Sequence, residues 1–180
     1  KIFVMFMVLA FVLSMFIDSI TVILFLAAIT ITQGKLLKFD PIPVIIAEIF
    51  CSNLGGSSTM CGDPPNIIIG TALHYTFTDF LLNTGVIAIL SLVLMIFFFY
   101  LCFRKKLNTN NLSKKDIAKM PSPDSAITSK HSFIISCIIF LCAVVLLVTH
   151  GQTGLTVSTI GIIAAIATCA TAGKKAKHIL

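Results

Sequence analysis

Long apolar stretches, separated by short polar segments, constrain the fold of this 180-residue chain more than any other feature. Five can be marked: Ile2 to Ile31, Pro41 to Leu73, Phe80 to Phe103, Phe133 to Thr149 and Leu155 to Ala172. Charged residues make up 11% of the sequence, whereas a typical globular protein has about 25%. Inside a bilayer every backbone N–H and C=O needs a partner within the protein, and a helix provides one. We therefore predict an all-α membrane protein surrounded by the lipid bilayer.

The first apolar stretch is too long for one upright crossing. A straight helix of about thirty residues measures about 45 Å, whereas the hydrocarbon core of a bilayer is about 30 Å thick. Two solutions stay open for residues 1–32. One is a strongly tilted helix, and the other is a re-entrant helical hairpin whose two arms meet near Asp18.

A polar island rich in Gly and Pro interrupts the second stretch from Ser52 to Asn66. Irregular backbone at membrane depth is tolerated only where it lines a cavity or is buried in protein. Two short half-helices around an unwound polar segment are typical of a transporter's binding site. We therefore predict one broken (unwound) transmembrane helix over residues 41–73. The remaining stretches predict three continuous transmembrane helices and a polar loop: residues 79–103, 132–150 and 154–172, with the loop at 104–131.

The charge pattern gives the topology. The 13 Lys and Arg residues lie almost entirely in the polar segments. With the hairpin, all of them fall on one face, and the opposite loops, residues 74–79 and 150–154, have none. By the positive-inside rule, the side of the membrane that carries these basic residues, including loop 104–131, is cytoplasmic. If the first stretch crossed the membrane completely instead, only Lys1 would lie on the opposite side. The pattern predicts a multi-pass integral protein of the plasma membrane, and it accounts for the net charge of +6 without nucleic-acid binding.

The island contains residue types that suit ion binding. Its glycines permit positive φ angles and close backbone approach: Gly55, Gly56 and Gly62. Carbonyl groups of an unwound segment from Ser52 to Ser58, together with short polar side chains, suit a small cation such as Na⁺. The candidate side-chain ligands are Asn53, Ser57, Ser58 and Thr59. The alternative is a proline-kinked structural helix without a ligand.

Pro64 and Pro65 stop one helix and suit the first turn of the next. The N-terminus of that next helix, with free N–H groups and the positive end of the helix dipole, favours an anionic group. Asp63 has three alternative roles: it holds a cation, carries a proton or caps the helix.

Two further acids lie within apolar stretches. A charged side chain at the centre of a membrane helix costs roughly 2.5–3.5 kcal/mol, so Asp18 is a candidate for ion or proton binding. It is also a candidate cap that accepts from the N–H of Ile20 or Thr21. Glu48 either pairs with a polar partner in the bundle or titrates, and structural pairing is the preferred interpretation.

Cysteine and histidine give no sign of a metal or redox site. The six cysteines lie in or beside apolar stretches without a CxxC pair, as expected of small buried apolar side chains. The four histidines lie near the predicted ends of the spans, which indicates interfacial placement: His74, His131, His150 and His178. Because no nucleophile–base–orienter set is apparent, we expect no enzyme and no cofactor other than a coupling ion.

Two motifs resemble those of the ion transporter superfamily. Residues 16–21, FIDSIT, resemble its "FLDN-T" hairpin tip, and residues 52–66, SNLGGSSTMCGDPPN, resemble its "SN-GG-AT--GDPPN" signature. The pattern is most similar to the citrate-transporter-like group that includes arsenite permeases and the pink-eyed dilution branch. Ser19 stands where Asn is more typical, and this change would weaken a carbonyl-type ligand.

The resemblance implies that a re-entrant hairpin and an unwound helix together form half of a substrate and ion site. It assigns Asp18, Ser19 and Thr21 to the hairpin tip. With the island, the candidate site comprises Asp18, Ser19, Thr21, Ser52, Asn53, Gly55, Gly56, Ser57, Thr59, Gly62, Asp63, Pro64, Pro65 and Asn66. The candidate ligands for Na⁺ are Asp18, Asn53, Thr59 and Asp63.

The implied function is secondary active transport of a small anion or organic acid, coupled to Na⁺ or H⁺ by alternating access. Two alternatives stay open: a Na⁺/H⁺ antiporter, and a truncated structural membrane fragment that transports nothing. Members of the superfamily have a second, inverted repeat, of which this sequence shows no copy. We therefore expect a second half-domain or a second copy of the chain as partner. The start at Lys1, without Met and inside an apolar stretch, is typical of a fragment.

Overall fold

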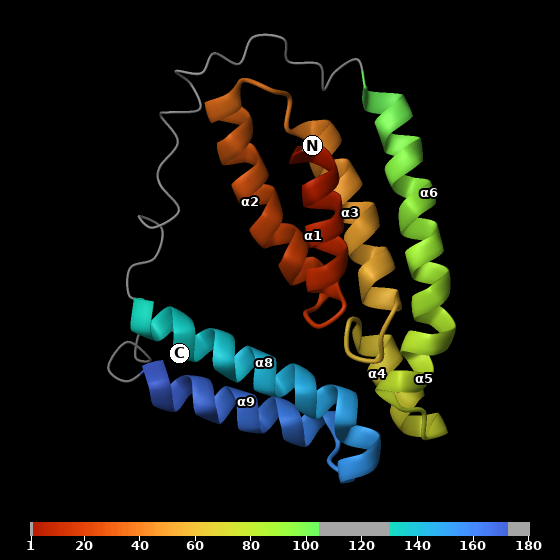
Figure 1. Ribbon diagram of the computed structural model, residues 1–180, viewed down its shortest axis with the longest axis vertical. Coiled ribbons are helices and arrows are strands. Elements are labelled where there is room, and N and C mark those ends of the chain that lie inside the picture. The colour runs from red at the N-terminus through yellow and green to blue at the C-terminus, as the bar shows by residue number, and fades with distance from the viewer. Residues whose placement is uncertain (1, 105–129, 173–180) are drawn as a thin grey trace. The chain divides into compact units, whose positions relative to one another are not determined.

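The computed structural model describes residues 2–104 and 130–172, and every regular element in these ranges is a helix. The all-helical prediction is confirmed. The chain divides into two compact units, residues 1–120 and residues 121–180. The first unit contains these elements: α1 (Ile2–Ser14), α2 (Ser19–Leu37), α3 (Ile42–Ser57), α4 (Pro64–Leu73), α5 (Phe77–Phe80), the π-helical segment η1 (Leu81–Gly85) and α6 (Val86–Phe103). The second contains α8 (Lys130–Thr153) and α9 (Val157–Ala172) (Figure 1).

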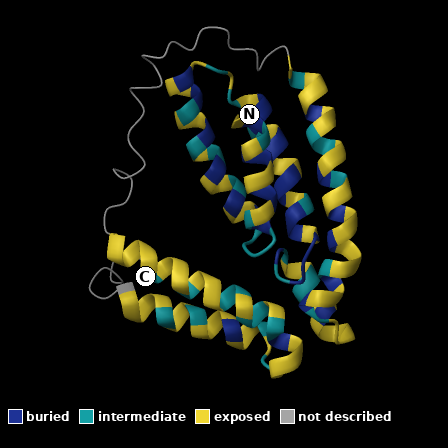
Figure 2. Ribbon diagram, viewed as in Figure 1, coloured by how far each residue is buried: buried dark blue, intermediate teal, exposed yellow. Residues whose placement is uncertain are grey.

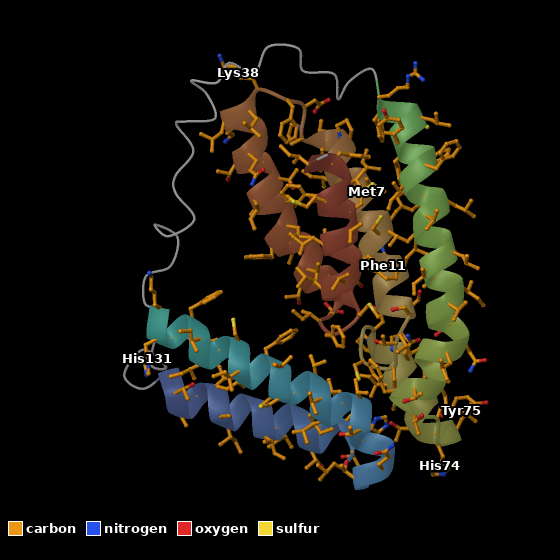
Figure 3. The ribbon with its side chains drawn as sticks, in the orientation of Figure 1. Met7, Phe11, Lys38, His74, Tyr75 and His131 are labelled. Carbon is orange, nitrogen blue, oxygen red and sulfur yellow. The ribbon has the colours of Figure 1, made fainter. Side chains whose placement is uncertain are left out.

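α3 is the central helix of the first unit and packs against α1, α2 and α6 (Figure 1). Met7 and Phe11 of α1, labelled in Figure 3, are almost completely buried in the apolar core. Val44 of α3 belongs to the same core. Buried residues run along α3, whereas α6 is largely exposed (Figure 2). Large apolar side chains such as Leu94 and Phe97 of α6 are 69% and 63% exposed. An apolar surface of this kind is what a bilayer covers.

The first apolar stretch folds as two helices rather than one. α1 ends at Ser14, the chain turns, and α2 begins at Ser19 and lies beside α1. The alternative of a single tilted helix is therefore wrong. The 19 residues of α2 measure about 28 Å along the axis, which is close to the thickness of the hydrocarbon core. The re-entrant placement of this hairpin stays a prediction.

Three described helical stretches are long and apolar enough to cross a membrane: Ser19–Leu37, Phe77–Phe103 and Lys130–Thr153. The last two correspond to the predicted spans 79–103 and 132–150. The predicted span 154–172 corresponds to α9, which has only 16 residues, about 24 Å, and belongs to the shorter apolar helices. Most of the predicted loop 104–131 lies outside the described residues.

α8 and α9 form a helical hairpin joined by residues 154–156. Gly154 has a φ of +70°, a left-handed conformation that glycine adopts without a steric penalty. Thr156 Oγ1 accepts the N–H of Thr159 at 3.2 Å and so begins α9. All predicted site residues lie in the other unit, so the candidate site belongs to α1–α6.

Candidate functional site at the α1–α2 turn and the α3–α4 break

Asp18 caps the N-terminus of α2. Its Oδ2 accepts the N–H of Thr21 at 3.1 Å and the hydroxyl of Thr21 at 3.3 Å. A side-chain acceptor here satisfies one of the N–H groups that a helix start leaves without a partner. The predicted cap is confirmed with Thr21 as its donor, and an ion-binding role for Asp18 stays a prediction.

The island is irregular over a shorter segment than predicted. α3 continues through Ser52 and both of its glycines to Ser57, and α4 begins at Pro64. The prediction of an unwound segment from Ser52 to Ser58 is therefore wrong for all but its last residue. Glycine within a helix costs about 1 kcal/mol relative to alanine. Here it allows neighbouring segments to approach more closely than a side chain would permit.

Three glycines show this close approach directly. A Cβ at Gly55 would lie 2.9 Å from the carbonyl carbon of Phe11 in α1. A Cβ at Gly56 would lie 2.7 Å from Cγ of Asp63, and one at Gly62 would lie 2.6 Å from the carbonyl oxygen of Ser14. Close approach was one of two predicted roles for these glycines and is confirmed. The other role is wrong, because none of the three has a positive φ.

Ser19 and Asp63 join the α1–α2 turn to the start of α4. The Ser19 hydroxyl donates to Oδ1 of Asp63 at 2.8 Å, although 44 positions separate the two residues. Behind them, the fully buried Ser52 hydroxyl donates to the carbonyl oxygen of Ser19 at 3.0 Å and lies 2.6 Å from the hydroxyl of Ser14. We call the four residues Ser14, Ser19, Ser52 and Asp63 the tip contact.

Thr59 and Asn66 hold the break between α3 and α4. Thr59 Oγ1 donates to the carbonyl oxygen of Met15 at 2.5 Å and accepts the N–H of Gly62 at 3.2 Å. Asn66 Nδ2 donates to the carbonyl oxygens of Gly56 at 3.2 Å and Thr59 at 2.9 Å. Thr59 therefore joins the break to the α1–α2 turn, and Asn66 joins α4 to the end of α3 and to the break.

The carbonyl groups at the end of α3 have protein donors. The Gly55 oxygen accepts both the N–H and the hydroxyl of Ser58. The Leu54 oxygen accepts the hydroxyl of Ser57 at 3.0 Å, and the Gly56 oxygen accepts from Asn66. These three carbonyl oxygens, which were expected to bind a cation, thus accept hydrogen bonds from the protein in this arrangement. The neighbouring carboxylates, Asp18 and Asp63, are the stronger candidate ligands for a cation.

Pro64 and Pro65 occupy the first turn of α4, as predicted. Neither residue has an N–H, and the N–H of Asn66 donates to the carbonyl oxygen of Asp63 at 3.1 Å. The Asp63 side chain makes no capping hydrogen bond, so the cap role proposed for it is wrong. The start of α4 therefore presents a carboxylate, and it lacks the row of free N–H groups that usually selects an anion.

Two of the predicted site residues, Asn53 and Ser57, do not lie on the buried face of α3. Asn53 and Ser57 each donate to a carbonyl of α3 itself, and both side chains are exposed. A helix places residues three, four and seven positions apart on one face. The buried face at this end of α3 accordingly includes Ser52, Gly55 and Gly56.

Ser14 and Thr84 belong to the site but were not predicted. A lone serine in an apolar helix usually bonds its own backbone or a neighbouring helix, so there was no reason in the sequence to assign Ser14 to the site. Thr84 Oγ1 donates to the Phe80 carbonyl at 2.8 Å and lies 3.4 Å from that of Ser58. It belongs to η1, and π-helical turns are frequent at functional sites. The polar pair Asn83-Thr84 at the start of an apolar helix was the available signal.

A cleft of about 710 Å³ lies beside the break. Its lining comes from α4, η1 and the segment between them: Asn66, Ile69, Tyr75, Asp79, Phe80, Asn83 and Thr84. Asn66 faces both the cleft and the break, so a ligand in the cleft would contact a residue that holds the break. Within the described ranges, no three His, Cys, Asp or Glu residues gather closely enough to hold a metal ion.

Comparison with known proteins identifies the family. A sequence model of citrate transporters matches residues 1–179. The chain belongs to the citrate transporter family. The predicted membership of the citrate-transporter-like group is thereby confirmed. Family membership and the apolar helices together identify an integral membrane protein of a transporter family.

Several relatives share part of this citrate transporter family sequence. The "46 kDa membrane protein" of Mycobacterium leprae is 39% identical over 82 residues, which cover 45% of this chain and 19% of that protein. An uncharacterized transporter of Mycobacterium tuberculosis is 36% identical over 83 residues, 46% of this chain and 19% of that protein. The human P protein is 44% identical over 66 residues, 37% of this chain and 8% of that protein. The chain thus spans a small part of these curated relatives. No solved structure matches it.

Proposed function

We propose that the α1–α2 turn and the α3–α4 break form one half of the substrate and ion site of a secondary transporter. The transported substrate would be a small anion or organic acid, coupled to Na⁺ or H⁺ by alternating access. The observation that carries the proposal is the hydrogen bond between Ser19 and Asp63, which joins a hairpin tip to a helix break in a chain of the citrate transporter family.

In this proposal the α1–α2 hairpin is re-entrant, and α3 and α4 form one interrupted crossing. The described basic residues of this unit, Lys35, Lys38 and Arg104, lie at the C-terminal ends of α2 and α6, and we assign these ends to the cytoplasmic face. Figure 3 shows Lys38 at one end of the unit and His74 near the other. The second half of the site would come from another half-domain or a second copy of the chain.

The chemistry of the half-site favours a cation as the first ligand. Asp18 and Asp63 bring carboxylates to adjoining segments, and the two prolines remove N–H donors from the start of α4. The described basic residues of the unit, Lys35, Lys38 and Arg104, lie at the opposite helix ends. A cation held beside Asp63 would supply the positive charge that an anionic substrate needs, which gives a physical reason for coupling the two.

Uptake of radiolabelled citrate by proteoliposomes of the full-length protein tests the proposal. We expect Asp63→Asn and Asp18→Asn each to lower uptake driven by a Na⁺ or H⁺ gradient at least about tenfold, equivalent to about 1.4 kcal/mol. Asparagine caps a helix as well as aspartate does, so the loss in Asp18→Asn would report the charge. Asp40→Asn is the matched control, since Asp40 is exposed and only bonds the N–H of Ile42. Full gradient-driven uptake in both site variants would refute the proposal.

Exchange of Na⁺ for H⁺ without an organic substrate is the second candidate. The observation that favours it is the pairing of a carboxylate with a hydroxyl at the tip contact, without a cationic side chain. Proton release from vesicles on addition of Na⁺ alone would support it, and a strict requirement for citrate would contradict it.

A further inference from the structure

Glu48 is a fully buried acid one helical turn before Ser52, the α3 member of the tip contact. It lies on α3, its exposed fraction is 0%, and it faces Thr30 of α2. Ser52 follows four positions later on α3, about 6 Å along the helix axis. Figure 2 shows buried residues along α3. Glu48 bonds Thr30 and no member of the tip contact, so it is a neighbouring group rather than a member of that contact.

The carboxyl group of Glu48 has one hydrogen-bond partner for its two oxygens. The hydroxyl of Thr30 donates to Oε1 at 2.5 Å. Oε2 is buried and meets no donor among the described residues. Carboxylates accept several hydrogen bonds when ionised, so one hydroxyl leaves most of the acceptor capacity unused.

The helices around Glu48 bring no positive charge to it. α1 has no ionisable residue from Ile2 to Ser14, and α2 has only Lys35, which is exposed. On α3 the one neighbouring ionisable group is the buried thiol of Cys51, three residues on and on the same face. Tyr100 and Cys102 of α6 are both exposed. Among the described residues, Glu48 thus has one hydroxyl partner, Thr30, and no cationic side chain on the helices packed around it.

A buried charge without a counter-charge or enough donors is far more costly than the neutral acid. In the neutral acid, Oε1–H can donate to Thr30 Oγ1 across the same short distance. Oε2 is then a carbonyl oxygen, for which a missing donor is a smaller penalty. The geometry of the pair therefore suits the protonated form.

We propose that Glu48 is a proton-binding site, protonated in this arrangement and one helical turn from the tip contact. The proton leaves Glu48 for water only when α2 moves away from α3 and water reaches the carboxyl group. If the proposed transport function holds, this site links proton binding to the packing of the α1–α2 hairpin on α3. An acid at such a place is a candidate proton relay of a transporter.

Infrared spectroscopy of the full-length protein in lipid tests protonation without any transported substrate. We expect a protonated-carboxyl C=O band at neutral pH that is absent in Glu48→Gln. Thr30→Val removes the hydrogen-bond partner and should shift the band to higher frequency. Thr32→Val is the matched control, because Thr32 is exposed and bonds the Ala28 carbonyl of its own helix. A spectrum without the band at neutral pH, or a band that Thr30→Val leaves in place, overturns the proposal. The Thr30→Val result decides the question even if Glu48→Gln does not fold.

Citrate uptake with and without a pH gradient tests the link to transport. We expect the stimulation by an inward proton gradient to disappear in Glu48→Gln and to persist in Thr32→Val. Full stimulation in Glu48→Gln would overturn the coupling role. If the wild-type protein moves no citrate and no proton, the proposed transport function fails, while the infrared result still decides whether Glu48 holds a proton.

Discussion

Uncharged hydroxyl groups make most of the tip contact. Ser14, Ser19 and Ser52 come from α1, α2 and α3, and only Asp63 brings a formal charge. A buried hydroxyl costs free energy unless it is bonded, and here each one has a partner from another segment. The position of the Asp63 carboxylate therefore depends on residues that bear no charge themselves.

Ser52→Ala should lower the free energy of unfolding by about 1–3 kcal/mol, because the Ser14 hydroxyl and the Ser19 carbonyl both lose a buried partner. Ser57→Ala is the control, with an expected change within about 0.5 kcal/mol, since Ser57 is exposed and bonds only its own helix. Denaturant titration of the purified protein in detergent measures both. Equal effects of the two substitutions would contradict the role given to Ser52.

At the scale of the helices, the α3–α4 break shows how far the sequence could predict the site. Asp63, Pro64 and the glycines were recognised because their residue types are unusual in an apolar stretch. Asn53 and Ser57 were included for the same reason, yet they lie beside the buried face. Their position follows from the helix continuing to Ser57, and this depends on close packing of Gly55 against Phe11, which composition does not reveal.

Gly56→Ala should displace the Asp63 carboxylate and destabilise the first unit by about 1–3 kcal/mol, the usual cost of an added methyl group in a packed site. Gly161→Ala in α9 is the matched control, because a Cβ there meets nothing within 4 Å. We expect the control to be neutral or slightly stabilising, since alanine favours helix. Thermal unfolding of both variants gives the comparison. An unaffected Gly56→Ala would show that the Asp63 side chain can move aside without loss of stability.

For the whole molecule, the spans and the family could be predicted from apolarity and two motifs, but the depth of the hairpin could not. α2 is apolar and long enough for either placement, and α1 with 13 residues measures only about 20 Å. The depth depends on the surrounding lipid and on the rest of the transporter, which the local sequence of α1 and α2 does not contain.

Labelling of single cysteines in a cysteine-free protein should locate the hairpin. With a membrane-impermeant maleimide added outside intact cells, we expect His74→Cys to react and Lys38→Cys to react only after permeabilisation. Ile20→Cys, at an exposed position near the turn, should be protected from outside if the hairpin is re-entrant. Labelling of Ile20→Cys from outside as complete as that of His74→Cys would contradict the re-entrant placement.

The contact between Gly56 and the Asp63 carboxyl group also limits how sequences of this family can diverge. A side chain at position 56 and a carboxylate at position 63 would compete for the same space. The two positions should therefore co-vary: homologues that replace Gly56 with a larger residue should carry a smaller one in place of Asp63. A single replacement at either position should then be tolerated less well than the matched pair, which makes the order of substitutions part of the evolutionary history of the site.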